Sequence, residues 1–433
     1  MLAKSRKLTN FEKIFIGSNE RCQFAVEVSK PELIPKIIRN LTTYILGFRL
    51  QLNGDKLQYH EKPFKVHPIP KSVKTAQQAC DFVDSIKYDF NDTFAVIAAD
   101  ESKVAISVSH LICDGGFFVD IYDKILLDEP VKTKSVLPIT TDIIFPDRLA
   151  KVTDSEIKAH HESVLDLTPV RWSPNYESLR RHFDKLQSYK NTDRHSNSNL
   201  SGVNCKYYAL ETPVKDFMFP KVQKFGLTES YWTGITLSYM AMNGELQNTF
   251  GVSTCIDLRQ DMPKEDINPS ITQNTSEINV IAKNVSPKST VRELGKMMRE
   301  DLNLKKSNNN FYTAYKSFLG SGYVFKPSPT CFAELSSVGR FKNENSPISD
   351  MWIQQTMLAK PAEGCAGFLS YSKDKYGENI LVTRFQQPLT VLNDEDSEIL
   401  VKSLMYAMKE MPPDVTIEEA YDELRRFQNS QRK

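Results

Sequence analysis

The sequence predicts an α/β (α+β) protein whose two halves are each a mixed sheet flanked by helices. Segments with the period-two alternation of strands take turns with segments that have apolar residues at helical spacing, which is typical of helices packed on a sheet. The 433 residues are too many for one ordinary core. The polar run 191–202 is the clearest linker, so we expect an N-terminal subdomain at 1–190 and a C-terminal one at 203–433. A surface loop inside one domain is the alternative for that run.

The first half alternates strands and helices. A helix begins at 29–32 with a serine, an early proline and an acid three residues later. The Asn-Gly pair at 53–54 favours a tight turn between strands. Segment 131–145 has the character of a loop. The predicted strands are 24–28, 48–52, 93–98 and 104–110, and the predicted helices are 33–45, 75–86, 117–126 and 153–165.

The second half repeats this style. Capping boxes begin two helices, one at Thr290 with Glu293 and one at Thr416 with Glu419. Asn393 caps a third helix, which precedes the one at Thr416 in the sequence. A further helix covers 228–242, and its aromatic residues favour core packing. The predicted strands are 203–210, 251–259, 277–282 and 329–338, followed by a hairpin of 367–372 and 378–385.

Composition and charge limit the classes of function. Hydrophobic residues make up 40% of the chain, and the formal net charge of +1 gives no electrostatic reason to expect nucleic acid or an anionic membrane. The seven cysteines include no Cys-x-x-Cys pair, which favours a reducing compartment. No signal peptide and no bilayer-spanning stretch is evident in the sequence. We therefore expect a cytoplasmic protein without a membrane span.

The stretch Ser-His-Leu-Ile-Cys-Asp-Gly-Gly at 109–116 is the candidate active site. His110 ends a strand, so it can face a cleft, and its ordinary pKa near neutrality suits a general base. Asp114 is placed to cap the next helix, and Gly115 and Gly116 would let the backbone turn sharply. A strand-end histidine followed by a capping aspartate is also common in turns with no catalytic role. Other parts of the chain must therefore distinguish an active site from a structural turn.

The His-x-x-x-Asp-Gly spacing resembles the signature of the acyl-CoA-dependent acyltransferase superfamily. That group includes chloramphenicol acetyltransferase, plant BAHD acyltransferases, peptide-synthetase condensation domains, and polyketide-associated and fungal alcohol acyltransferases. Four more stretches are similar to superfamily segments in the same order, namely Leu-Thr-Asn-Phe-Glu at 8–12, Ile-Asp-Leu-Arg at 256–259, Gln-Asn-Thr at 273–275 and Ser-Ser-Val-Gly-Arg at 336–340. The likeness is strongest to the polyketide-associated and alcohol acetyltransferase branch. It implies two chloramphenicol-acetyltransferase-like subdomains with a tunnel between them.

The resemblance also implies roles for residues at the site. His110 would take the proton from an acceptor hydroxyl or amine as that atom attacks a thioester carbonyl. Asp114 would pair with Arg259 and hold the loop of Gly115 under the histidine, without relaying charge.

Substrate contacts are less defined by the resemblance. Asn274 and Ser337 are the candidates for contacts to the substrate or oxyanion, although Ser337 stands where the superfamily has asparagine. Acyl-CoA would be a co-substrate, with no bound cofactor. The superfamily holds coenzyme A by scattered contacts, and this chain has no glycine-rich phosphate loop, so no residues are assigned to it.

The implied function is that of a monomeric acyl-CoA-dependent O-acyltransferase (EC 2.3.1) that moves an acyl group, in the first place acetyl, to a small-molecule alcohol. One alternative is a condensation-like enzyme that uses an acyl carrier protein or an amine acceptor. Another is a non-catalytic binding module. Ser109 stands where condensation domains usually have a first histidine, and the late Asp-Phe-Gly-Trp-Gly of the plant branch has no equivalent.

Other chemistries have weaker support in the sequence. No Gly-x-Ser-x-Gly elbow of a serine hydrolase is present. His160 and His161 are adjacent on a polar helix, where we expect solvated surface, and His60 and His67 lack the spacing of metal ligands. We therefore expect no metal site. Cys113 lies inside the motif, and we expect it to face the core.

Overall fold

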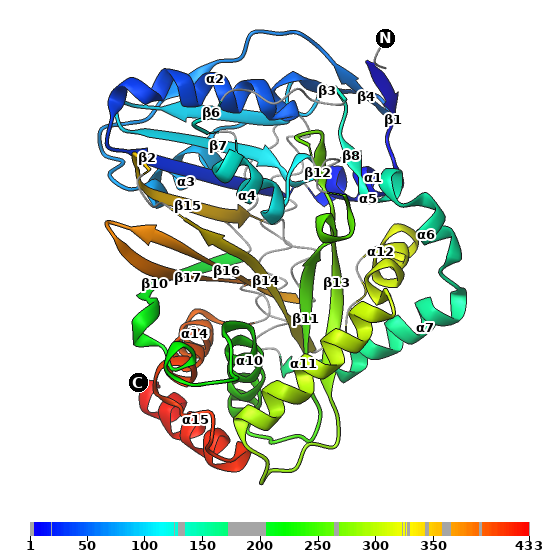
Figure 1. Ribbon diagram of the computed structural model, residues 1–433, viewed down its shortest axis with the longest axis vertical. Helices are drawn as coiled ribbons and strands as arrows, with labels where there is room; N and C mark the ends of the chain where they lie inside the picture. The colour runs from blue at the N-terminus through cyan, green and yellow to red at the C-terminus, as the bar shows by residue number, and fades with distance from the viewer. Residues whose placement is uncertain are drawn as a thin grey trace.

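The computed structural model describes residues 4–18, 20–124, 126–128, 135–171, 205–263, 268–322, 324, 326, 330–342, 346–356, 365–388 and 392–432. It has the mixed α/β architecture that the sequence predicts, with helices on mixed sheets (Figure 1). The predicted linker 191–202 lies outside the described residues. No described helix has the length and apolar character needed to cross a membrane.

The first sheet is five-stranded, in the order β15-β2-β7-β6-β5. Antiparallel pairing places Cys22 of β2 opposite Val108 of β7. Helices α2 (Ile34–Tyr44) and α3 (Ala76–Ser85) contact this sheet. Its strands are β2 (Arg21–Val28), β5 (Val66–Pro68), β6 (Ala95–Ala99), β7 (Lys103–Ser109) and β15 (Ile348–Thr356).

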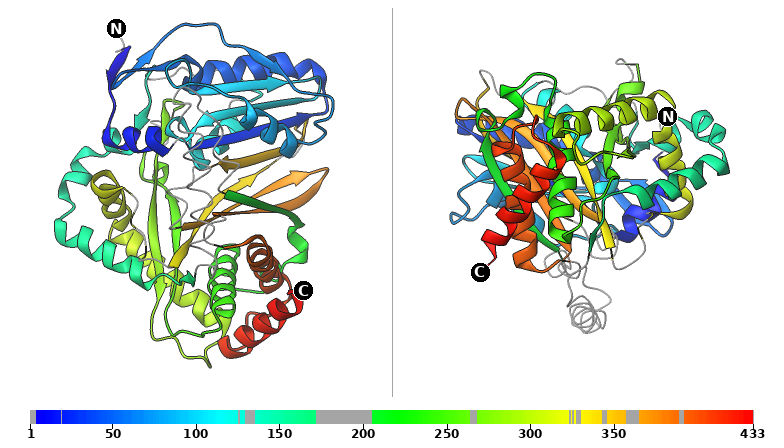
Figure 2. Two further views of the ribbon diagram at one scale, coloured as in Figure 1. Left: turned by 180° about the vertical axis from the view of Figure 1, so that it is seen from behind. Right: turned by 90° about the horizontal axis from the view of Figure 1, so that it is seen from below.

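The second sheet is seven-stranded, in the order β10-β17-β16-β14-β11-β13, with β9 beside β14. Helices α10 (Leu227–Asn243), α14 (Asp394–Glu410) and α15 (Ile417–Gln431) pack together at the end of the molecule remote from the first sheet (Figure 2). The strands are β9 (Val170–Arg171), β10 (Cys205–Pro213), β11 (Phe250–Asp257), β13 (Thr275–Ala282), β14 (Thr330–Phe341), β16 (Cys365–Lys375) and β17 (Glu378–Pro388).

Each half of the chain contributes a strand to the sheet of the other half. β15 comes from the second half and pairs with β2, whereas β9 comes from the first half and pairs with β14. The parallel pair of β8 (Ile139–Thr140) with β12 (Ile271–Gln273) joins the halves again. The cut predicted at 191–202 therefore does not divide the sheets cleanly in space.

Smaller elements complete the fold. A three-stranded sheet is made of β1 (Ser5–Lys7), β4 (Lys56–Tyr59) and β3 (Leu50–Asn53). Short 3₁₀ turns include η1 (Pro31–Leu33), η2 (Leu46–Arg49), η3 (His110–Ile112) and η7 (Leu258–Asp261). The other α-helices of the described residues are α1 (Asn10–Ser18), α4 (Gly115–Lys124), α5 (Thr141–Ile144), α6 (Pro146–Lys151), α7 (Asp154–Ser163), α11 (Val291–Ser307) and α12 (Asn310–Ser321).

Most predicted helices and strands are present, and the capping boxes of Thr290 and Thr416 form as expected. The cap predicted at 29–32 is wrong, because a 3₁₀ turn precedes α2 and no side chain caps it. Segment 131–145 is not simply a loop, since its described part contains β8 and α5. Neither α12 nor β15 was predicted.

Candidate active site

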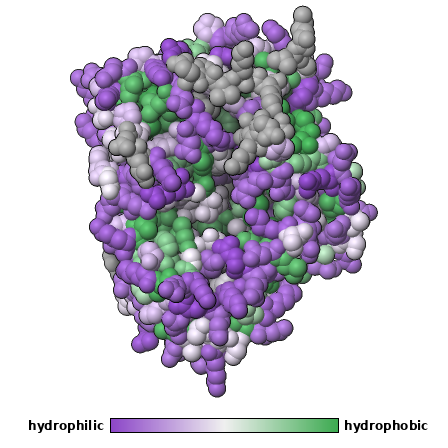
Figure 3. Space-filling view, viewed as in Figure 1, coloured by the Kyte–Doolittle hydropathy of each residue, from purple (hydrophilic) through white to green (hydrophobic). Residues whose placement is uncertain are grey.

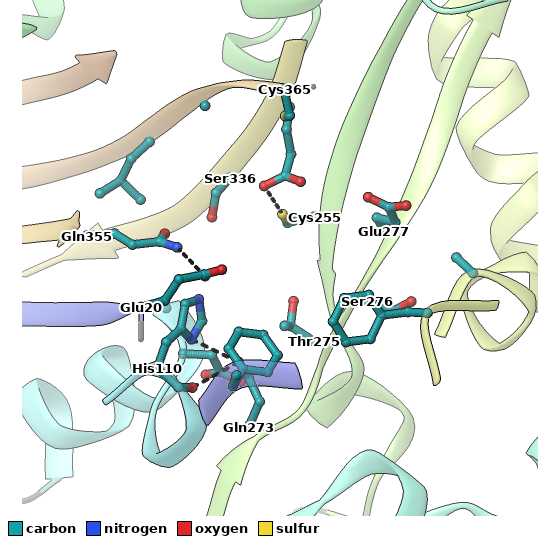
Figure 4. A pocket seen from close by; sticks show the side chains of 18 of the residues that line it. Glu20, His110, Cys255, Gln273, Thr275, Ser276, Glu277, Ser336, Gln355 and Cys365 are labelled. Carbon is teal, nitrogen blue, oxygen red and sulfur yellow. Dashed lines mark hydrogen bonds between the residues drawn. The ribbon is translucent and has the colours of Figure 1, made fainter. Parts of the chain in front are cut away.

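His110 follows the last residue of β7 and begins the turn η3. Its backbone N–H donates to the carbonyl of Glu20 at 2.8 Å, so the turn is tied to the residue before β2. The Phe15 ring of α1 lies 5.1 Å from the imidazole, centroid to centroid. The strand and the apolar neighbour together hold the histidine at one side of an internal cavity (Figure 4).

Hydrogen bonds fix the tautomer of His110. Its Nδ1 lies 2.8 Å from the Cys113 carbonyl oxygen, which can only accept, so Nδ1 carries the proton. Nε2 is then the ring nitrogen that can accept a proton when the imidazole is neutral, as a general base requires. Gln273 Nε2 lies 3.1 Å from the His110 carbonyl oxygen and 2.9 Å from Nδ1. Because Nδ1 donates, the Gln273 amide gives its proton to the carbonyl.

Asp114 is a buried carboxylate whose bonding capacity is well used. Arg259 Nη1 lies 2.9 Å from one carboxylate oxygen and 3.0 Å from the other, which is the ion pair that the resemblance implied. The backbone N–H of Phe117 donates to Asp114 at 2.7 Å and caps α4, and the backbone N–H of Asn274 donates at 2.7 Å. Burial alone would lower the pKa of Arg259, but Asp114 and Asp257 outweigh burial and raise it. The pair thus joins the two halves directly beneath His110.

The two glycines are required for close approach, and the predicted reason for them is wrong. Neither Gly115 nor Gly116 has a positive φ. A Cβ at Gly116 would lie 2.5 Å from Asp257 Oδ2 and 2.7 Å from Arg259 Nη1, and one at Gly115 would lie 2.9 Å from Val338 Cγ2. A side chain at either position would therefore force its neighbours at the start of α4 to shift.

The cavity has a volume of about 160 Å³ and is lined by residues of both halves. Helix α1 contributes Phe11 and Phe15, and the helix is anchored by the buried Glu12, whose carboxylate receives Arg6 Nη1 at 2.6 Å. Figure 3 shows a face that is hydrophilic over much of its area, with apolar side chains across its middle. Residues far apart in the chain meet around this mostly apolar space: Cys22, Phe318 and Gln354 lie between 36 and 332 positions from one another.

Neither Asn274 nor Ser337, the two predicted substrate contacts, is among the residues that line the cavity. The side chain of Asn274 is fully buried, and its Oδ1 accepts from Thr141 Oγ at 2.6 Å, so its amide serves the packing of the halves. Ser337 is exposed on β14, while its neighbour Ser336 lines the cavity, because successive side chains of a strand point to opposite faces.

Several lining residues were missed in the sequence. Glu20, Cys22 and Gln273 lie near His110, whereas Glu277 and Glu334 come from β13 and β14 of the second sheet. A signal was available for the last two, because charged residues inside otherwise apolar strands need a reason to be there.

The predicted position of His160 is also wrong. The sequence predicted solvated surface, but only 10% of its side chain is exposed and it lines the cavity, with Nε2 3.7 Å from Glu277 Oε1. Its neighbour His161 lies 2.7 Å from Ser317 Oγ of α12. The physical reason is that α7 packs against α12, so one face of a polar helix becomes internal. Burial lowers the pKa of His160 to about 4.

The environment of His110 favours its protonated form. Burial alone would lower the pKa of His110, but the charge and hydrogen bond of the Cys22 sulfur and the carboxylate of Glu20 raise it above the ordinary value. The pKa of Cys22 is correspondingly lowered: burial raises it, and contacts with Cys113 and His110 outweigh burial. Cys113 is itself fully buried, as expected, with its Sγ 3.5 Å from the Ser109 carbonyl oxygen.

Among the described residues, no cluster of three or more histidine, cysteine or acidic side chains is suited to hold a metal ion.

No protein-family model matches this sequence, and no curated protein matches it. Solved structures do match it over almost the whole chain. The polyketide synthase associated protein 5 from Mycobacterium tuberculosis has a TM-score of 0.61 at 11% identity, covering 94% of this chain and 99% of that one. The first condensation domain of the calcium-dependent antibiotic synthetase gives 0.61 at 12% identity, covering 96% and 99%. The condensation domain of the Monacolin K polyketide synthase MokA gives 0.60 at 11%, covering 96% and 99%. At these identities the likeness establishes a shared fold.

Proposed function

We propose that this protein is a condensation-like acyltransferase. It would move an acyl group from a thioester, borne by a carrier protein or by coenzyme A, to an amine or hydroxyl of an acceptor. The observation that carries the proposal is His110, whose Nδ1 is committed to the Cys113 carbonyl while its ring lines an internal cavity. Two of the similar solved structures are condensation domains, which favours this form of acyl transfer over the acetylation of a simple alcohol.

The chemistry needs only one proton carrier. The acceptor nitrogen or oxygen attacks the thioester carbonyl while His110 Nε2 takes the proton from it. The carbon–sulfur bond then breaks, and the imidazolium returns the proton to the departing thiolate. Base assistance of this kind contributes about 10²–10⁴-fold, and holding both substrates in one cavity adds to it through orientation.

Asp114 has a positioning role in this scheme. Its carboxylate is taken up by Arg259 and by two backbone N–H groups, so it does not reach the imidazole as a relay. The ion pair supports the turn that carries His110.

The test measures thiol release with a panel of donors and acceptors. The donors are acetyl-CoA, longer acyl-CoAs and acyl-pantetheine thioesters, which mimic the arm of a carrier protein, and the acceptors are alcohols and amines. Wild type is compared with His110→Ala and with His67→Ala, a histidine of β5 outside the cavity. We expect acceptor-dependent release that falls about 10²–10⁴-fold in His110→Ala alone.

The same panel separates the remaining alternatives. Undiminished release in folded His110→Ala would contradict the assignment of the base. Release with acyl-CoA and alcohols alone would return the function to an O-acyltransferase. Absence of release with every pair would favour a non-catalytic binding module.

A further inference from the structure

Acidic side chains outnumber basic ones on the cavity wall. Glu20, Glu277 and Glu334 line it, and no lysine or arginine is found among the described lining residues. The fourth carboxylate, Asp114, is already neutralised by Arg259. The cavity of a protein with balanced overall charge therefore has an excess of negative groups at its site.

Glu277 and Glu334 are near one another and poorly compensated. Ser253 Oγ donates to Glu277 at 3.0 Å, and Cys255 Sγ donates weakly to Glu334 at 3.5 Å. His160 is the basic neighbour of Glu277, but its lowered pKa leaves it neutral. Burial and the charge of Glu277 raise the pKa of Glu334 to about 7. Two carboxylates in this state gain from a cation placed between them.

A second acidic point lies beside His110. Glu20 accepts a hydrogen bond from Gln355 Nε2 at 3.3 Å and lies next to the imidazole (Figure 4). In that view Glu20 and His110 lie on one side of the cavity, and Cys255 and Glu277 lie across it. The cavity therefore has two acidic ends.

An independent observation at the histidine end indicates a ligand. Gln273 is fully buried and lines the cavity, and its Oε1 has no hydrogen-bond partner among the described residues. Its Nε2 is committed to the His110 carbonyl, so the oxygen stays available. A buried acceptor left unpaired costs free energy that a ligand N–H would recover.

We infer that the acceptor is a diamine. This inference rests on the proposed function and names its substrate class. The reacting amine lies between His110, Glu20 and the Gln273 oxygen, and the second amine is held as an ammonium ion by Glu277 and Glu334. Apolar side chains such as Phe15, Phe318 and Leu369 line the same cavity and suit a polymethylene chain. The neutral amine attacks the thioester carbonyl, a carbon–nitrogen bond forms as carbon–sulfur breaks, and the amine proton reaches the thiolate through His110.

The test is a binding experiment without any acyl donor. Calorimetric titrations compare the series from 1,3-diaminopropane to 1,8-diaminooctane with monoamines and amino alcohols of equal length. We expect at least one diamine to bind about tenfold or more tightly than its matched monoamine. Glu277→Gln and Glu334→Gln should each remove that advantage and leave monoamine affinity unchanged. The control is Glu101→Gln, an exposed carboxylate between β6 and β7, which should change nothing.

The outcomes are distinguishable from those of the proposed function. Equal affinity of diamines and monoamines for the wild type would overturn the inference even if thiol release with other acceptors succeeds, and this comparison needs no variant to fold. Persistence of the diamine advantage in both folded glutamine variants would overturn it as well. A diamine advantage that these variants abolish supports the inference even if no thiol release is found.

Discussion

Two carboxylates that line the same cavity differ in how their charge is met. Asp114 receives a guanidinium at 2.9 Å and two backbone N–H groups at 2.7 Å. Glu334 receives a thiol at 3.5 Å, and its pKa rises to about 7. Asp114 is buried and Glu334 is half-buried, so neither is freely exposed, and reduced exposure alone does not distinguish a structural acid from a site. The difference lies in how many donors each has, which makes Asp114 part of the framework and leaves Glu334 ready for a ligand.

The largest expected effect on stability comes from removing the carboxylate of Asp114, which is fully hydrogen-bonded. Asp114→Ala leaves Arg259 buried without its main partner, and we expect the free energy of unfolding to fall by about 3–5 kcal/mol. Denaturant unfolding of the two proteins measures this. Asp114→Asn is the milder companion, since it keeps the size of the side chain. If both variants unfold within error of the wild type, the ion pair is not structural.

The next largest effect on stability is expected at Gly116, which lies against the Arg259 side chain of the same ion pair. In Gly116→Ala the new Cβ would lie 2.5 Å from Asp257 Oδ2, so the ion pair must shift, at a cost of about 1–3 kcal/mol. Gly320→Ala in α12 is the matched control, because no atom lies within 4 Å of its Cβ position. Thermal unfolding of both variants should separate them, with Gly320→Ala unchanged or slightly stabilised. Equal destabilisation would mean that close packing at Gly116 is not the cause.

The comparison also explains which site residues could be predicted from the sequence. His110, Asp114 and Arg259 were predicted, because a local motif and one strand ending carry them. Gln273 was seen only as part of a turn-like stretch, since its contact with His110 depends on the pairing of β12 with β8. Such pairing between distant segments is not encoded in local periodicity.

The acidic wall was missed for a related reason. Glu334 and Ser336 face inward together because they are two apart on β14, but that face becomes a cavity wall only where β14 lies between β11 and β16. His160 was assigned to the surface because the polar character of α7 conceals its contact with α12. The strand β15, which closes the first sheet from the second half, gave no clear alternation to predict it.

Replacing Glu334, which has few hydrogen-bond donors, should have a smaller effect on stability, and that effect should depend on pH. The pKa of Glu334 is raised in the fold, so its ionised form destabilises the fold, and this cost appears as the pH rises from the ordinary carboxyl range through about 7. Glu334→Gln removes the cost. We expect the variant to match the wild type near pH 4 and to exceed it by about 1–2 kcal/mol at pH 8, allowing for water in the cavity.

Urea unfolding at both pH values checks this, with Glu101→Gln as the exposed control. A loss of stability in Glu334→Gln at pH 8 would reveal a cationic partner in the folded protein, and the contrast with Asp114 would disappear.

The smallest effect concerns the base. Glu20 stabilises the imidazolium form of His110, so Glu20→Gln should lower the pKa of His110. Because His110 must be neutral to accept a proton, the acidic limb of the kcat/KM profile should move to lower pH. Cys22→Ala should move the limb in the same direction, since its sulfur also raises that pKa. If the acidic limb of the kcat/KM profile stays at the same pH in both variants, neither Glu20 nor Cys22 stabilises the imidazolium form of His110. A move to higher pH would reverse the sign of the interaction and place the titrating group elsewhere in the cavity.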